Sequence, residues 1–345
     1  MVTTSHSTIA TPLQSAREPY GELQPFLDDP TVEEIWINAP ERIFIARNGK
    51  SELTTLVLTT EKVRAIMDRI LLWSGRRIDL SQPFVDARLP DGSRLHIAIP
   101  EITAENWAIN IRKHLMRGKT LNDLVDLNVM NQSIRDHLIR AIETGQNILV
   151  SGSTQAGKTT LLNALLSAVP VSDRVITIEE VFELRPRLPD CIAMQTKSAN
   201  LEGQGAISIR RLIKEALRMR PSRIVIGEIR EAESLDLLIA LNSGVPGMGT
   251  IHSNSAEEAL RKLQILPLLA GENITQDFLT PTVTHAINLV IHVGFDVDGV
   301  RRILQVRSLT GRYEGHIIET EPVFTWQRDR YISGFLPSLP DRPQR

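Results

Sequence analysis

The sequence LVSGSTQAGKTTLL, residues 149–162, decides the fold of this chain. It begins in an apolar run, residues 148–150, which is typical of a buried parallel strand. It continues as GSTQAGKT from Gly152 to Thr159, the complete G-x-x-x-x-G-K-[ST] pattern of a phosphate-binding loop (P-loop). Strong helix formers follow. We therefore predict a buried strand, a P-loop and a helix, in that order.

Each residue type in this loop has a physical task. Main-chain N–H groups must turn inward to bind polyphosphate, and Gly152 and Gly157 remove side chains that would block this approach. Lys158 is expected to reach the β- and γ-phosphates, Thr159 to offer its hydroxyl to Mg²⁺, and the following helix to direct its positive end at the phosphates. The predicted nucleotide-binding residues are Gly152, Ser153, Thr154, Gln155, Ala156, Gly157, Lys158, Thr159 and Thr160.

The composition indicates a globular protein of about two domains. The 345 residues are 42% hydrophobic and 23% charged, with a formal net charge of −2, which does not indicate a strongly basic nucleic-acid surface. Cys191 is the single cysteine, so an internal disulfide is excluded and a reducing, cytosolic setting is favoured. We expect no signal peptide and no membrane-spanning run, so membrane association would come through a partner.

Changes in pattern along the chain predict its domains. Residues 1–17 are rich in Ser and Thr and are expected to form a disordered tail. Residues 18–114 contain hairpin signals and an amphipathic helix, and predict an α+β domain. Residues 115–130 are expected to be a linker in which Leu121, Leu124 and Leu127 could pack on one side. Residues 131–328 alternate strands with helices, which predicts an α/β domain with a mostly parallel sheet, and residues 329–345 are expected to fray.

Hydrolysis needs a group that orients water, and acids after apolar strands are the candidates. Glu228 follows the strand RIVIG (223–227), at the sheet edge where α/β proteins bind their ligands. Glu179 and Glu180 follow the strand at 174–178 in the same way, and Glu179 could hold the Mg²⁺ hydration shell. These residues alone leave open which of Glu179 and Glu228 activates water.

The remaining candidates are a histidine and several arginines. His252 ends the short strand GTIH (249–252) and could sense the γ-phosphate. Lys158 and Mg²⁺ cannot reach every oxygen of the transferred phosphoryl group, so Arg94 and Arg112 of the first domain are expected to close the site from above. Arg88, Arg218 and Arg230 are weaker candidates.

Six stretches together carry a family resemblance. They are FVDARLPDGSRLHIAIP (84–100), INIRK (109–113), GSTQAGKTTLLNAL (152–165), ITIEEVFEL (176–184), LRMRPSRIVIGEIR (217–230) and GTIHSNSAEEAL (249–260). In this order they resemble the secretion ATPases of type II and type IV secretion systems, and most of all the CpaF branch that drives tight-adherence (Flp-type) pilus assembly. The resemblance spans residues from about 20 to 325.

The resemblance implies a RecA-like ATPase domain with a smaller N-terminal α+β domain. It assigns Glu179 and Glu180 to the acidic box, Glu228 to the Walker-B box and His252 to the histidine box. Arg94 and Arg112 match arginines that touch phosphate, and Arg230 matches the arginine of the GEIR element. It further implies a homohexamer at the cytoplasmic face of the inner membrane, with nucleotide between the domains and membrane platform proteins as partners.

Three departures from the family pattern leave the branch open without removing a catalytic group. Gln155–Ala156 stands inside the loop where a small pair is usual, Glu231–Ala232 replaces Gly-Gly, and Val245–Pro246–Gly247 replaces a turn with histidine.

The sequence thus predicts a Mg²⁺-dependent ATPase that powers pilus or secretion assembly. One alternative is a nucleic-acid-translocating motor, which the near-neutral charge and the 4% aromatic content disfavour. Another is a nucleotide-gated scaffold without turnover, which the intact acids disfavour.

Overall fold

The computed structural model of the chain describes residues 20–47, 49–74, 76–89, 91–113, 119–197, 204–271 and 273–337. The predicted tail 1–17 lies outside these residues, as do 115–118 of the predicted linker and 338–345 of the predicted C-terminal tail. The chain forms two compact units, residues 1–117 and 118–345, which are described separately below.

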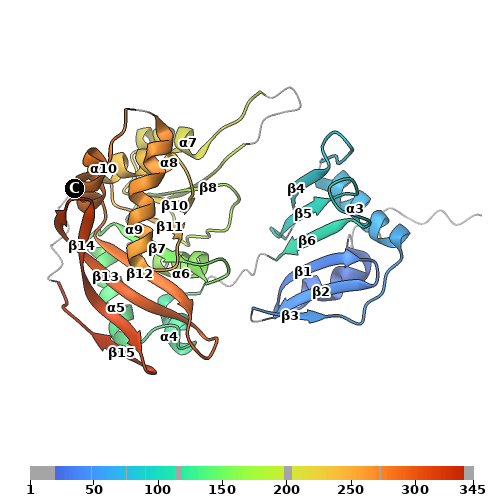
Figure 1. Cartoon of the computed structure of the whole chain (residues 1–345), viewed down its shortest axis with the longest axis horizontal. Coiled ribbons are helices and arrows are strands. Elements are labelled where there is room, and N and C mark those ends of the chain that lie inside the picture. Colours follow the sequence, from blue (N-terminus) through green and yellow to red (C-terminus); the bar gives the residue numbers. More distant parts are fainter. Residues whose placement is uncertain are drawn as a thin grey trace, which may run out of the picture. The chain divides into compact units, whose positions relative to one another are not determined.

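The first unit is an antiparallel sheet with helices. The sheet has the order β3-β2-β1-β6-β5-β4 (Figure 1). Its strands are β1 (Val32–Ala39), β2 (Arg42–Arg47), β3 (Lys50–Leu53), β4 (Phe84–Arg88), β5 (Arg94–Ala98) and β6 (Ala108–Arg112). Its helices are η1 (Gly21–Leu23), α2 (Gln24–Asp28) and α3 (Thr60–Ser74).

Apolar periodicity explains the core of this unit. In β1 the side chains of Val32, Ile35 and Ile37 are buried, and α3 buries the face that carries Ile66 and Ile70. These residues form one cluster, which holds the helix against the sheet. The predicted α+β architecture of this half is confirmed.

The second unit is built on a largely parallel sheet with the order β15-β14-β13-β12-β7-β11-β10-β8-β9. Its strands are β7 (Ile148–Gly152), β8 (Val175–Glu179), β9 (Cys191–Gln195), β10 (Arg223–Ile229), β11 (Gly247–His252), β12 (Leu289–Phe295), β13 (Arg301–Glu314), β14 (Ile317–Gln327) and β15 (Arg330–Ser333). Its helices are α4 (Leu121–Asp126), α5 (Gln132–Glu143), α6 (Lys158–Leu166), α7 (Ile209–Ala216), η2 (Leu217–Met219), α8 (Glu233–Asn242), α9 (Ala256–Ile265), η3 (Leu266–Ala270) and α10 (Gln276–Ala286).

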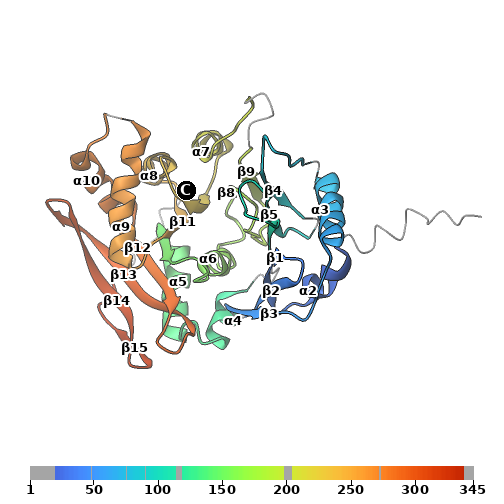
Figure 2. The same cartoon turned by 45° about the vertical axis from the view of Figure 1, so that its right-hand side comes forward.

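Helices cover both faces of this sheet, and each face has its own core. Along β7, Ile148 and Val150 pack in a cluster with α4, α5 and α6, while Leu149 packs in a cluster with α7, α8, α9 and α10. The green helices α4, α5 and α6 lie together in Figure 2, in mutual contact. The predicted α/β sheet with helices on both faces is confirmed.

The interpretation of residues 115–130 as a linker misses a helix. Residues 121–126 form α4, which a capping box opens: the Asp123 N–H donates to the Thr120 hydroxyl, and the Asp123 side chain accepts from the Thr120 N–H. Leu121 and Leu124 are buried in the core of the second unit, whereas Leu127 is 49% exposed. Only part of the expected leucine face therefore packs.

The sequence predicts that residues 329–345 form a frayed tail, but part of this segment is ordered in the structure. The predicted strand pair is present as β12 and β13, and β14 and β15 extend it by antiparallel pairing. β15 adds at the edge of the sheet, where Tyr331 packs against Trp326 and donates its hydroxyl to the Val129 carbonyl. Residues 330–333 thus gain order from strand pairing and side-chain contacts that no local pattern encodes.

Candidate functional site

The P-loop connects β7 to α6 in the middle of the sheet. β7 is buried along its length between β11 and β12, and α6 begins at Lys158. Gln155 and Gly157 adopt left-handed backbone conformations, with φ values of 61° and 99°. Alternating right- and left-handed residues produce a concave row of main-chain N–H groups, the geometry that binds phosphate. The Thr159 hydroxyl lies in the first turn of α6, where the positive end of the helix dipole favours anions.

Gly152 has a second role that the motif does not reveal. A Cβ at this position would lie 2.4 Å from the main-chain oxygen of Val293 in β12. Glycine is therefore required here by the close approach of a neighbouring strand, in addition to any approach of phosphate. Gly157, by contrast, is required by its backbone conformation, since its nearest foreign atom would be 3.9 Å from the added carbon.

Lys158 is held beside His252. The register of β11 with β7 pairs His252 with Gly152, which brings the histidine to the start of the P-loop. The Lys158 ammonium donates to the Ser153 carbonyl at 2.9 Å and lies 3.0 Å from His252 Nδ1. An ammonium group has no lone pair, so Nδ1 must accept and the imidazole proton belongs on Nε2.

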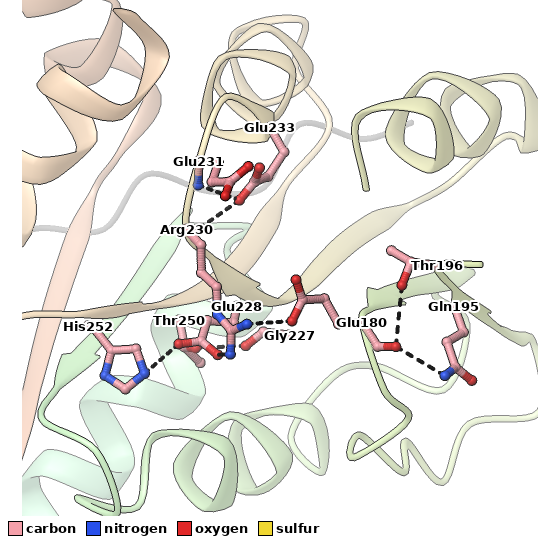
Figure 3. Close-up of polar contacts among 10 residues, drawn as sticks. All are labelled: Glu180, Gln195, Thr196, Gly227, Glu228, Arg230, Glu231, Glu233, Thr250 and His252. Atoms are coloured by element: carbon pink, nitrogen blue, oxygen red, sulfur yellow. Dashed lines mark hydrogen bonds and ion pairs between the residues drawn. The ribbon is translucent and has the colours of Figure 1, made fainter. Parts of the chain in front are cut away.

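That imidazole proton faces Glu228. His252 Nε2 lies 2.5 Å from Glu228 Oε1, and the Arg230 guanidinium donates at 2.5 Å both to Glu228 Oε2 and to Glu180 Oε2 (Figure 3). The polar contacts thus run without a break from Lys158 through His252, Glu228 and Arg230 to Glu180. The arrangement joins the P-loop cation to the candidate water-orienting acid.

The environment of His252 favours its neutral form. Burial and the adjacent Lys158 ammonium lower the pKa of His252, against the opposing effect of Glu228. A neutral imidazole whose Nδ1 accepts from Lys158 and whose Nε2 lies next to Glu228 is consistent with a lowered pKa.

The two candidate acids, Glu179 and Glu228, have different surroundings. Glu179 is buried, and its Oε1 accepts the main-chain N–H groups of Glu183 and Leu184 at 2.8 and 2.9 Å. Gly227 makes room for it, because a Cβ there would lie 2.9 Å from Glu179 Cγ. The side chain of Glu228 is 22% exposed and belongs to the chain of polar contacts that begins at Lys158. Glu228 therefore lies in a partly exposed network of charged and polar groups, whereas Glu179 is fixed on the main-chain amides of the segment after β8.

Arg94 and Arg112 lie opposite each other in the first unit. The register of β5 with β6 pairs them directly, and β1 places Glu34 opposite Arg112 on the other side. Directly opposed residues of antiparallel strands share a face, where like charges repel unless an anion or an acid offsets them. The same register pairs Arg88 with Arg94, although the side chain of Arg88 is outside the described part of the chain.

The other candidates differ in surroundings. Arg218 has a 79% exposed side chain 3.7 Å from Glu215, as expected for a surface charge. Arg230, in contrast, belongs to the chain of polar contacts at the site. The sequence groups Arg218 and Arg230 together as weaker candidates, but their surroundings differ. Sequence reasoning missed Arg301 at the start of β13, whose Nε donates to the Gln155 carbonyl at 3.1 Å. No spacing signals a contact across 146 residues.

Comparisons with known proteins identify the family of the chain. The family model described as "Type II/IV secretion system protein" matches residues 17–293. The chain belongs to this family. It is 32% identical to a putative conjugal transfer protein of Mycobacterium tuberculosis, over 95% of this chain and 94% of that protein. It is also 32% identical to the type IV secretion system protein PtlH of Bordetella pertussis, over 71% and 79% of the two chains.

A solved structure of the Yersinia pseudotuberculosis ATPase DotB matches 90% of this chain and 82% of that chain, with a TM-score of 0.60 and 17% identity, which supports the fold alone. Membership of this family supports nucleotide binding by the chain, and the matched residues 17–293 include the P-loop sequence. Among the described residues, no helix is both long and apolar enough to cross a bilayer.

Proposed function

We propose that the chain is a Mg²⁺-dependent ATPase that powers a pilus or secretion machine. The observation that carries this proposal is the contact chain from Lys158 through His252 to Glu228, because it links a P-loop cation to an acid at the carboxyl ends of neighbouring strands. A fold that only bound nucleotide would have no need of this acid beside the lysine.

The protein's own groups have separate roles in this proposal. The loop amides and Lys158 bind the β- and γ-phosphates, and Glu228 orients the attacking water. Arg94 and Arg112 neutralise charge on the transferred group. Mg²⁺ would supply further positive charge against the phosphates; Thr159 would hold it directly, and Glu179 and Glu180 through its water shell.

The proposed setting is the cytoplasmic face of the inner membrane. There a homohexamer would act on membrane platform proteins, and a Flp-type pilus is the specific machine that the resemblance of the six sequence stretches supports. The similarity to a type IV secretion protein and a putative conjugal transfer protein supports the broader class of machine.

Phosphate release tests the proposal. We expect the purified chain to hydrolyse ATP with Mg²⁺, and Lys158→Ala to abolish turnover because it removes the cation closest to the transferred group. Near-normal hydrolysis by Lys158→Ala would refute this assignment.

The same assay with added DNA separates the alternatives: strong, salt-dependent stimulation would indicate a nucleic-acid motor. Binding of ATP without release of phosphate would indicate a scaffold.

A further inference from the structure

Arg301 is distant from the P-loop in the sequence of the second unit but contacts it in the fold. It is the first residue of β13, and its Nε donates to the main-chain carbonyl of Gln155 at 3.1 Å. Its Cδ is the nearest foreign atom, at 3.9 Å, to a Cβ built on Gly157. The side chain therefore lies against the part of the loop that turns through left-handed conformations.

The hydrogen bond from Arg301 can stabilise the unusual backbone conformation of Gln155. Its φ of 61° is unfavourable for a residue with a side chain, by roughly 1–2 kcal/mol. The peptide unit between Gln155 and Ala156 is held at both ends. Arg301 donates to its carbonyl, and its N–H donates to the Ser153 carbonyl at 3.3 Å.

This peptide unit leads directly to the P-loop lysine. The Ser153 carbonyl that accepts from the Ala156 N–H also accepts from the Lys158 ammonium at 2.9 Å. The orientation of the 155–156 peptide thus affects both the row of loop amides and the position of Lys158.

Arg301 is itself positioned by its hairpin. The register of β12 with β13 pairs it with Phe295, and its guanidinium carbon lies 5.3 Å from the centroid of the Phe295 ring. Stacking on an aromatic ring restricts the guanidinium plane, so the direction of the Nε–H is defined.

The geometry points to Arg301 as a positioning residue that holds the P-loop in the shape that binds nucleoside triphosphate. The inference rests on the proposed function, because it assumes that this loop binds ATP. Arg301 acts through the Gln155 carbonyl, and its loss weakens nucleotide binding more than the chemical step.

The first test measures binding of a fluorescent ATP analogue and steady-state hydrolysis by Arg301→Ala. A hydrogen bond from a charged donor is lost, so we expect the Kd to rise about tenfold while kcat at saturation stays within about twofold. Arg312→Ala is the matched control, since Arg312 lies on the same strand and pairs with Glu319 away from the loop. Arg301→Gln is expected to show the same loss should the alanine variant misfold.

The second test places Arg301→Ala in a Gln155→Gly background. Glycine adopts a positive φ without steric cost, so the loop has less need of the arginine and the loss should shrink to about twofold. An undiminished loss in that background would overturn the inference, because Arg301 would then act on the nucleotide through its charge. Wild-type affinity in both Arg301 variants would also overturn it. Failure of the wild type to bind the analogue would instead refute the proposed function.

Discussion

At the scale of single residues, the structure separates acids that the sequence leaves equivalent. Glu179 is the last residue of β8 and Glu228 lies near the end of β10, but Glu179 is buried and accepts two main-chain N–H groups. Glu228 instead contacts His252, which contacts Lys158. A carboxylate fixed on amides orders a loop, whereas one joined to the P-loop lysine through a histidine has the position proposed above for orienting water.

Glu228→Gln should bind ATP normally and hydrolyse it on the order of 10²-fold more slowly, because an amide cannot accept a proton from water. Binding and phosphate release at saturating ATP check this. Glu179→Gln is the comparison, and we expect it to lower stability more than kcat. Unchanged turnover in Glu228→Gln, with turnover lost in Glu179→Gln, would move the water-orienting role to Glu179.

Burial of His137 predicts a loss of stability in mild acid. Burial, and secondarily Arg140, lowers the pKa of His137 below its ordinary 6.5. The unfolded chain therefore binds a proton more readily, and stability falls as the pH drops from about 6.5 towards the folded-state pKa. We expect His137→Leu to reduce the difference in unfolding free energy between about pH 7.5 and about pH 5.5. The same pH dependence in His137→Leu as in the wild type would contradict the prediction.

At the scale of elements, α4 shows how packing determines the role of a polar segment. Residues 115–130 lack a long apolar period, yet a capping box and two buried leucines make residues 121–126 part of the second unit's core. Such a short helix is marginal alone and depends on its contacts with α5 and α6.

Leu124→Ala should therefore destabilise the second unit by about 2–5 kcal/mol, because it leaves a cavity against α5 and α6. Leu127→Ala is the matched control, and the 49% exposure of Leu127 limits its cost to about 1 kcal/mol or less. Denaturant unfolding, with the transitions of the two units fitted separately, gives both values. Equal costs would mean that α4 does not pack as described.

At the scale of the whole molecule, the two units carry different candidate phosphate-binding groups. The first unit places Arg94 and Arg112 opposite each other on neighbouring strands. The second unit carries the P-loop and the acids. Two arginines at paired positions on neighbouring strands suit a polyphosphate, which supports the proposal that both contribute to nucleotide chemistry.

Arg94→Ala and Arg112→Ala should each lower turnover on the order of 10²-fold, since arginines that neutralise the transferred phosphoryl group contribute at least this much in related chemistry. Binding to the P-loop should change far less. The exposed Arg42→Ala, on β2 of the same unit, is the control. A nucleotide-bound structure in which Arg94 and Arg112 face solvent in every subunit would contradict the proposed role of these arginines.

The sequence by itself determined the local features of this protein. The strand, loop and helix at residues 148–166, the acids at or near the ends of apolar strands and the amphipathic helix at 60–74 all follow from spacing over a few residues. Propensity, periodicity and glycine conformations act over that range, so these predictions needed no long-range information.

Only the tertiary structure decided which distant residues meet. β11 lies between β7 and β10, and this order places His252 between Lys158 and Glu228. The same long-range pairing brings Arg301 to Gln155 and Val293 against Gly152. The physical reason is that strand order and register are set by pairing across the whole sheet, where many segments have similar apolar patterns and no short stretch specifies its neighbour.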